Sequence, residues 1–182
     1  GLQAVCEGQA YDKEFESRDN VTRDEYIHMI DLKTGYLIGL SAELGAISVG
    51  ANDDDVVKIR EYGRLIGRAF QIQDDLLEIY SNSNNMGKSL ESDLLLGKKT
   101  YIMIQAKESV ASELSNALAL AQENFPEGLK KVRTLLSDSG IHQEAQEKIK
   151  LTIKEADLLL SELNIYTNKL SFFSNLITNR GN

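Results

Sequence analysis

The sequence predicts an all-α protein, and three observations support this fold class. The chain of 182 residues contains a single proline, which favours long uninterrupted helices. Thr22 and Glu25 form a capping-box pattern, a signature of a helix start. Apolar residues then recur at three- and four-residue steps, whereas no segment alternates as a half-buried strand would. We therefore predict one helical domain over residues 1–182.

The first part of the chain should form two helices. Residues 1–7 carry no Met and no cap, and they read as the middle of a helix, so we expect the sequence to be a fragment or a cleavage product. The helix that Thr22 opens should run to about Val49. Its apolar positions are spaced as one buried face requires: Tyr26, Ile30, Leu37, Leu40 and Leu44.

A second long helix should follow the break at residues 50–52. Asp53 is expected to cap it, and Asp54 and Asp55 would lie in its first turn, where negative charge complements the helix dipole. This helix should reach Tyr80. Three consecutive aspartates could also bind a metal, but charge at a helix terminus is the simpler interpretation.

The rest of the chain should be a long loop followed by further helices. The loop, residues 81–99, is long for a structureless connection, which favours a functional role. Helical periodicity resumes near Thr100 and continues to about Asn124, and Pro126 and Gly128 are expected to mark a turn. Further helices are predicted over Leu129–Ser137, His142–Leu163 and Tyr166–Thr178.

Composition excludes several classes of protein. The net charge of −8 argues against a nucleic-acid binder, which needs a basic patch, and against docking on anionic lipid. No apolar stretch is long and uninterrupted enough to predict a membrane span. The one cysteine, Cys6, cannot form an internal disulfide, so a reducing, cytoplasmic location is expected.

The segment 70–78 carries the most informative polar residues. On a helix Gln71, Asp74 and Glu78 share one face, and Asp75 flanks it. Carboxylates on a mostly apolar helix are costly unless something compensates their charge, and a hard cation such as Mg²⁺ would do so. The alternative, that these carboxylates lie on a solvated face, stays open from this segment alone.

Lysines near small or hydroxyl residues form a second candidate group. Lys33 and Thr34 are adjacent in a predicted helix and could bind phosphate through charge and a hydroxyl donor. The loop adds Gly87-Lys88-Ser89 and Gly97-Lys98-Lys99-Thr100, with Asp93 between them. A P-loop is excluded, because Asn82 stands where its first glycine is required.

Taken in order, these pieces resemble the trans-isoprenyl diphosphate synthases, also called polyprenyl synthetases. The resemblance covers essentially the whole chain, and the bacterial branch looks most similar. It is carried by the following segments: Glu7-Gly8-Gln9 with Asp12, Tyr26-Ile27, Lys33-Thr34-Gly35, Phe70-Gln71-Ile72-Gln73-Asp74-Asp75-Leu76-Leu77-Glu78, Gly87-Lys88, Ser92-Asp93-Leu94 and Gly97-Lys98-Lys99-Thr100.

The resemblance implies the C-terminal part of an isoprenoid synthase-type helical bundle. It implies a Mg²⁺-dependent prenyltransferase, usually a homodimer, that condenses an allylic diphosphate with isopentenyl diphosphate to give a longer trans-polyprenyl diphosphate. Asp74 would bind Mg²⁺ directly, while Asp75 and Glu78 would hold metal-bound water. The residues expected to contact the diphosphate or help it leave are Lys33, Thr34, Gln71, Lys88 and Lys98.

This sequence also departs from the family pattern. Glu78 replaces the usual final aspartate of the second aspartate-rich motif. The first such motif and the isopentenyl diphosphate site would lie upstream, so we expect a truncated fold that lacks its N-terminal half and is inactive alone. Three alternatives remain: a noncatalytic or split subunit that needs a partner chain, a class I terpene cyclase, and a helical scaffold without a ligand.

Overall fold

The computed structural model describes residues 1–80, 94, 97–163 and 168–179, and within these residues it contains helices and no strand. The all-α prediction is therefore confirmed for the described part of the chain. The elements are α1 (Leu2–Ser17), α2 (Arg23–Ile30), the π-helical segment η1 (Asp31–Gly35), α3 (Tyr36–Ser48), α4 (Asp53–Tyr80), α6 (Tyr101–Ser109), α7 (Ala111–Glu123), α8 (Phe125–Asp138), α9 (Ile141–Ser161) and α10 (Asn168–Thr178).

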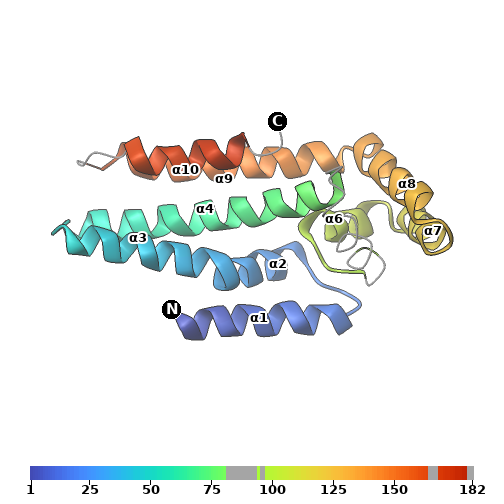
Figure 1. The fold of residues 1–182 in the computed structure, drawn as a ribbon, viewed down its shortest axis with the longest axis horizontal. Helices are drawn as coiled ribbons and strands as arrows, with labels where there is room; N and C mark the ends of the chain where they lie inside the picture. Colours follow the sequence, from blue (N-terminus) through green and yellow to red (C-terminus); the bar gives the residue numbers. More distant parts are fainter. Residues whose placement is uncertain (81–93, 95–96, 164–167, 180–182) are drawn as a thin grey trace.

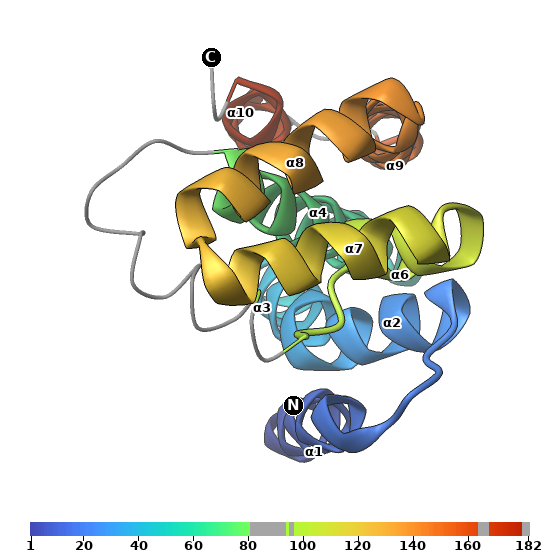
Figure 2. The same ribbon diagram turned by 90° about the vertical axis from the view of Figure 1, so that its right-hand side faces the viewer.

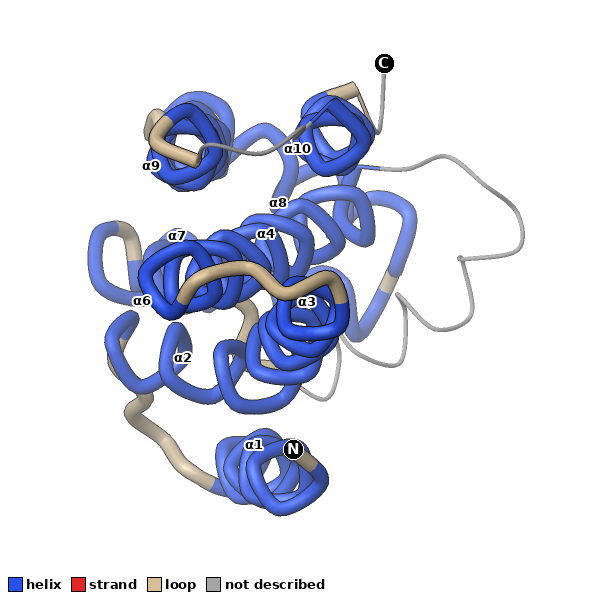
Figure 3. Tube along the Cα trace, turned by 90° about the vertical axis from the view of Figure 1, so that its left-hand side faces the viewer, coloured by secondary structure: helices blue, strands red, loops and turns tan. Residues whose placement is uncertain are grey.

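The long helix α4 lies at the centre of the arrangement. It packs against α3 and η1 on one side and against α9 on the other, while α1 lies outside η1 (Figure 1). An end view shows α9 and α10 side by side beyond α4 (Figure 3). Helices α6, α7 and α8 gather at one end of the long helices, where α7 packs on α8 (Figure 2).

The helix predicted to begin after Thr22 is present, with its capping box. The Thr22 hydroxyl accepts the Glu25 N–H at 3.2 Å, and the Glu25 carboxylate accepts the Thr22 N–H at 2.8 Å. One feature was not predicted: the middle of this helix widens into the π-helical segment η1. Such segments are rare and frequently occur at functional sites.

The prediction of one buried face along this helix is confirmed only in part. Tyr26 and Ile30 are buried, but Leu37 and Leu44 are exposed. Beyond η1 the contact with α4 is made by glycines instead, at Gly35, Gly39, Gly63 and Gly67. A Cβ placed on Gly67 would lie 2.6 Å from the Gly35 Cα, so the two helices meet backbone to backbone.

The second long helix is present as α4, Asp53–Tyr80, but Asp53 is not its cap. The Asn52 side chain takes that role, because its Oδ1 accepts the Asp55 N–H at 2.9 Å. Its Nδ2 also donates to the Asp55 carboxylate at 2.9 Å. An asparagine preceding the helix can turn its side chain back over the first N–H groups, and it leaves Asp53 as the first helical residue.

The single helix expected from Thr100 to Asn124 is two helices, α6 and α7. Thr100 caps α6 through its hydroxyl, and the chain breaks at Val110, whose φ of −141° is not helical. The turn expected at Pro126 lies earlier, at Asn124, which caps α8. Proline is tolerated in a first helical turn because the N–H that it lacks has no partner there.

The last helices broadly match the prediction. Helix α9 spans residues 141–161 against the predicted 142–163, and α10 begins at Asn168, after undescribed residues. No helix in the described part of the chain is both long enough and apolar enough to cross a membrane. Cys6 is exposed and is a free thiol.

Candidate functional site

The middle of α4 packs against η1, and this contact brings two of the predicted residues together. Gln71 comes from α4 and Thr34 from η1. The Thr34 hydroxyl donates to the Gln71 side-chain oxygen at 3.2 Å, across 37 residues of sequence. Both side chains are half-buried. The hydroxyl and amide therefore sit at the boundary between the helix contact and solvent, where each retains further hydrogen-bonding capacity.

Lys33 is held by a residue to which the sequence analysis gave no role. Its ammonium forms an ion pair with the Asp12 carboxylate of α1 at 2.6 Å. Helix α1 can come this close because Gly8 has no side chain: a Cβ there would lie 2.4 Å from the Lys33 backbone nitrogen. Asp12 and Gly8 belong to the segments that carried the family resemblance. Their place in those segments was the signal that could have identified them.

Asp75 is buried and ties three helices together. Its Oδ2 accepts a hydrogen bond from the Tyr26 hydroxyl of α2 and another, at 3.1 Å, from the Tyr101 N–H at the start of α6. Burial raises the pKa of Asp75 to about 6, although both hydrogen bonds act to lower it. Burial and the Asp75 charge in turn raise the pKa of Tyr26 well above its ordinary value.

Lys98 approaches the same end of α4. Its ammonium lies 3.5 Å from a Glu78 carboxylate oxygen. Of the other residues predicted for this site, Asp74 is half-buried on α4. Lys88 lies outside the described residues, as does Asp93.

The carboxylates on α4 fit a magnesium ion whose other ligands are water and phosphate oxygens. Nowhere among the described residues do three or more His, Cys, Asp or Glu side chains form a group that could hold a metal ion. Mg²⁺ does not require such a cage, since it usually takes one or two carboxylates and fills its octahedron with water and phosphate oxygens. Asp74 and Glu78, one helical turn apart, offer that limited set.

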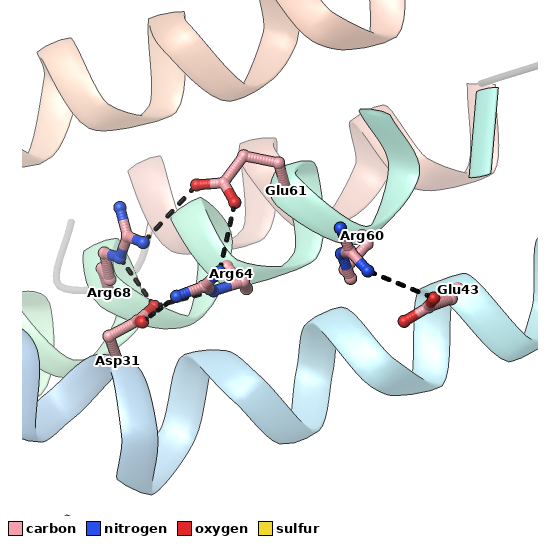
Figure 4. A network of polar contacts seen from close by, with 6 residues as sticks. All are labelled: Asp31, Glu43, Arg60, Glu61, Arg64 and Arg68. Carbon is pink, nitrogen blue, oxygen red and sulfur yellow. Dashed lines mark hydrogen bonds and ion pairs between the residues drawn. The ribbon is translucent and has the colours of Figure 1, made fainter. Parts of the chain in front are cut away.

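A network of ion pairs precedes this site along α4 (Figure 4). Asp31, the first residue of η1, is buried and accepts from the Arg64 Nε at 3.2 Å and from the Arg68 Nε at 2.8 Å. Glu61 lies 3.6 Å from Arg64 and 3.4 Å from Arg68. Burial alone would raise the pKa of Asp31, but the two guanidinium groups outweigh it and the pKa is lowered.

The sequence analysis missed this network. Arg60, Arg64 and Arg68 recur every four residues, which places three cations on one face of α4. That spacing was a usable signal. The buried carboxylate that accepts from Arg64 and Arg68 could not be identified from spacing, because Asp31 is more than thirty residues away from them in sequence.

Comparisons with known proteins agree with the helical arrangement and with the motifs. Residues 2–138 match the family model described as "Polyprenyl synthetase". A geranylfarnesyl diphosphate synthase of Natronomonas pharaonis is 45% identical over 104 residues, which cover 57% of this chain and 30% of that protein. A geranylgeranyl diphosphate synthase of Saccharolobus solfataricus is 38% identical over 162 residues, covering 89% of this chain and 48% of that protein.

A solved structure gives the same picture. The geranylgeranyl pyrophosphate synthetase of Pyrococcus horikoshii superposes with a TM-score of 0.84 and 32% identity, over 98% of this chain and 55% of that one. The chain thus spans about half, or less, of the curated relatives that it matches. The similarity to the bacterial branch that we expected is not supported, because these relatives are archaeal.

Proposed function

Because the chain belongs to the polyprenyl synthetase family, we propose that it supplies the second metal- and diphosphate-binding part of a Mg²⁺-dependent trans-prenyltransferase. The reaction would join an allylic diphosphate to isopentenyl diphosphate and give a longer trans-polyprenyl diphosphate. The names of the relatives, geranylgeranyl and geranylfarnesyl diphosphate synthases, support a product of that class.

One observation carries this proposal: the end of α4 collects hydroxyl, amide, carboxylate and ammonium groups from segments far apart in sequence. Thr34 reaches Gln71, and Lys98 reaches Glu78. The Asp75 hydrogen bonds fix the position of α6, which follows directly after Lys98, Lys99 and Thr100. A packed core alone gives no reason for this concentration of polar groups.

Each group has a part in the proposed chemistry. Bound Mg²⁺ would neutralise charge on the diphosphate and make it a better leaving group. Asp74 and Glu78 would hold the ion, Asp74 directly, and Asp75 would position α4 and metal-bound water. Lys33, Lys98 and Lys88 would face the developing negative charge on the leaving diphosphate. Thr34 and Gln71 would orient its oxygens through hydrogen bonds.

The ion pair between Lys33 and Asp12 bears on this role. Asp12 holds the Lys33 ammonium of η1 against α1. A diphosphate carries more negative charge than one carboxylate, so it could draw the same ammonium toward itself. Asp12 would then keep Lys33 positioned between turnovers.

A complete site needs groups that this chain does not contain. We propose that a first aspartate-rich motif and the isopentenyl diphosphate site come from the segment that relatives carry in addition, either on the same polypeptide or, as the alternative, on a separate partner chain. The homodimeric state and the cytoplasmic location stay predictions.

Reconstitution tests this function. The chain would be mixed with the part of the Saccharolobus solfataricus enzyme that it does not match, and incorporation of labelled isopentenyl diphosphate would be measured with Mg²⁺. We expect activity only when both parts are present, and we expect Asp74→Ala to abolish it. Activity that is unchanged in the Asp74→Ala mixture would contradict the proposal.

A further inference from the structure

A concave pocket lies between α6, α7 and the segment that joins α1 to α2. This pocket has a volume of about 470 Å³, within the range typical of small-molecule sites. Its floor is apolar and is formed by buried side chains of three elements: Val21, Met103, Ile104 and Leu114. Tyr101, whose N–H contacts Asp75, does not line it, so the pocket uses a different face of α6 from the one at the end of α4.

The mouth of this pocket is basic in a chain that is acidic overall. Lys98, Lys99 and Lys107 line it, and Asp19 is the only acid among the described lining residues. Lys99 donates to the Gly97 carbonyl at 3.0 Å, and Lys107 donates to the Asp19 carbonyl. Main-chain carbonyls satisfy hydrogen bonds but carry no net charge. Neither lysine forms an ion pair within the described residues, so their charges are left for another partner.

Apolar floor and cationic mouth together define the ligand chemistry. An inorganic anion would leave the floor hydrated, and a neutral apolar molecule would leave the ammonium groups without a counter-charge. A molecule with an anionic head and an apolar chain satisfies both parts.

We propose that this pocket binds a single-chain amphiphile whose head is a phosphate or diphosphate. The head contacts Lys99 and Lys107, and the chain lies on Met103, Ile104 and Leu114. Binding here needs no metal ion, because the lysines supply the positive charge. The proposal therefore does not rest on the magnesium site of α4, although Lys98 borders both.

Titration calorimetry of the whole chain with farnesyl monophosphate in EDTA tests the proposal. Chelation removes the metal-dependent part of any binding at the α4 site. We expect binding at least about tenfold tighter than that of inorganic phosphate, from burial of the chain, and tighter than that of farnesol, from the head group. Affinity no greater than that of inorganic phosphate would overturn the proposal.

Variants then locate the site. Lys99→Glu with Lys107→Glu should weaken farnesyl monophosphate about tenfold or more, whereas Lys130→Glu, an exposed lysine on α8, should not. Ala119→Trp adds bulk to the pocket at an exposed α7 position without a change of charge, and it should also weaken binding. Unchanged affinity in the charge-reversed chain or in Ala119→Trp would place the ligand elsewhere.

Two further measurements complete the test. One distinguishes a single bound amphiphile from a membrane surface, and the other distinguishes this pocket from the α4 site. Vesicles of phosphatidic acid should compete only weakly, because a pocket encloses one chain, and binding to vesicles alone would overturn the proposal in favour of a membrane surface. Lys33→Glu, which reverses an ammonium assigned to the α4 site, should leave binding in EDTA unchanged. Loss in that variant would mean that the signal came from the α4 site.

Discussion

Asp31 and Asp75 are both buried carboxylates at the contact between α4 and the helix formed by α2, η1 and α3, yet their partners differ. Asp31 receives two arginine side chains, and its pKa is lowered. Asp75 receives a tyrosine hydroxyl and a main-chain N–H, both neutral, and burial raises its pKa to about 6. The same helix pair therefore neutralises one carboxylate with its own cations, whereas among the described residues the other has no cation at contact distance.

This difference separates a structural region from the region that we propose to be functional. Around Asp31 the charges are balanced within the chain, so the network stabilises the fold. Around Asp75 burial raises the pKa most, and the Asp74 carboxylate directly before it along α4 adds to that rise, while the Tyr26 and Tyr101 hydrogen bonds and the Lys98 charge lower it without cancelling the rise. Carboxyl groups with perturbed pKa values are a common feature of functional sites.

The largest expected effect comes from removing the balanced carboxylate. Asp31→Ala leaves Arg64 and Arg68 facing each other without the carboxylate between them. We expect a loss of about 3–4 kcal/mol in the free energy of unfolding, toward the low end of the range for buried pairs because both guanidinium groups are partly exposed. Urea denaturation at neutral pH measures this loss. A loss below about 1 kcal/mol would show that the network is not structural.

The second prediction concerns pH and has opposite signs for the two carboxylates. The folded pKa of Asp75 is raised, so its stabilising contribution is present below the ordinary aspartate pKa and is lost as pH rises through about 6. As pH rises from about 4 to about 7, the free energy of unfolding of Asp75→Asn should increase by about 2–3 kcal/mol relative to that of the wild type.

Asp31 provides the matched contrast. Its folded pKa is lowered, so its contribution is present above the ordinary pKa and is lost as pH falls through the folded value. The free energy of unfolding of Asp31→Asn should therefore approach that of the wild type at low pH. In the same pH range Asp75→Asn should lose its gain in stability over the wild type. Urea denaturation across the pH range compares both variants, and slopes of the same sign would contradict the assignment of their partners.

A smaller effect should follow from the hydroxyl that satisfies Asp75. Tyr26→Phe keeps the buried ring and removes the donor. We expect a cost of about 1–2 kcal/mol near neutral pH, because the ionised carboxylate loses a hydrogen bond. The pH at which stability falls should also move upward, since this bond lowers the Asp75 pKa. Thermal unfolding at several pH values would detect both changes, and an unmoved transition would show that the bond contributes little.

The smallest effect is expected at the exposed end of the same contact. Arg60 and Glu43 lie 3.4 Å apart, with the Arg60 side chain largely in solvent. Glu43→Gln should change the free energy of unfolding by no more than about 0.5 kcal/mol, as for most exposed pairs. The same urea titration serves here. A loss comparable to that of Asp31→Ala would mean that burial does not decide the ranking.

Local signals in the sequence predicted most of the fold. The capping box at Thr22 and Glu25 and the long helix α4 are present, because caps and periodicity depend on neighbours in sequence. Predictions that depended on tertiary packing were less successful. Leu37 and Leu44 matched a buried helix face, but glycines make the contact with α4 and the leucines are exposed.

The candidate site likewise has a part that the sequence predicted and a part that it did not. The α4 face with Gln71, Asp74 and Glu78 was readable from spacing, and Thr34 indeed lies against Gln71. The partners of Asp75 were not readable, since Tyr26 and Tyr101 are separated from it by 49 and 26 residues. The π-helical segment that presents Lys33 and Thr34 has no signature that our sequence analysis recognised.

The central claim is that the end of α4 binds magnesium together with a diphosphate. Calorimetric titration of the chain with geranyl diphosphate, with Mg²⁺ and with EDTA, tests it most directly, using Asp74→Ala and, as a matched control, Asp54→Ala at an exposed position of the same helix. The account predicts a Mg²⁺-dependent gain in affinity that Asp74→Ala removes and Asp54→Ala keeps. No such gain, or a gain that survives Asp74→Ala, would contradict it.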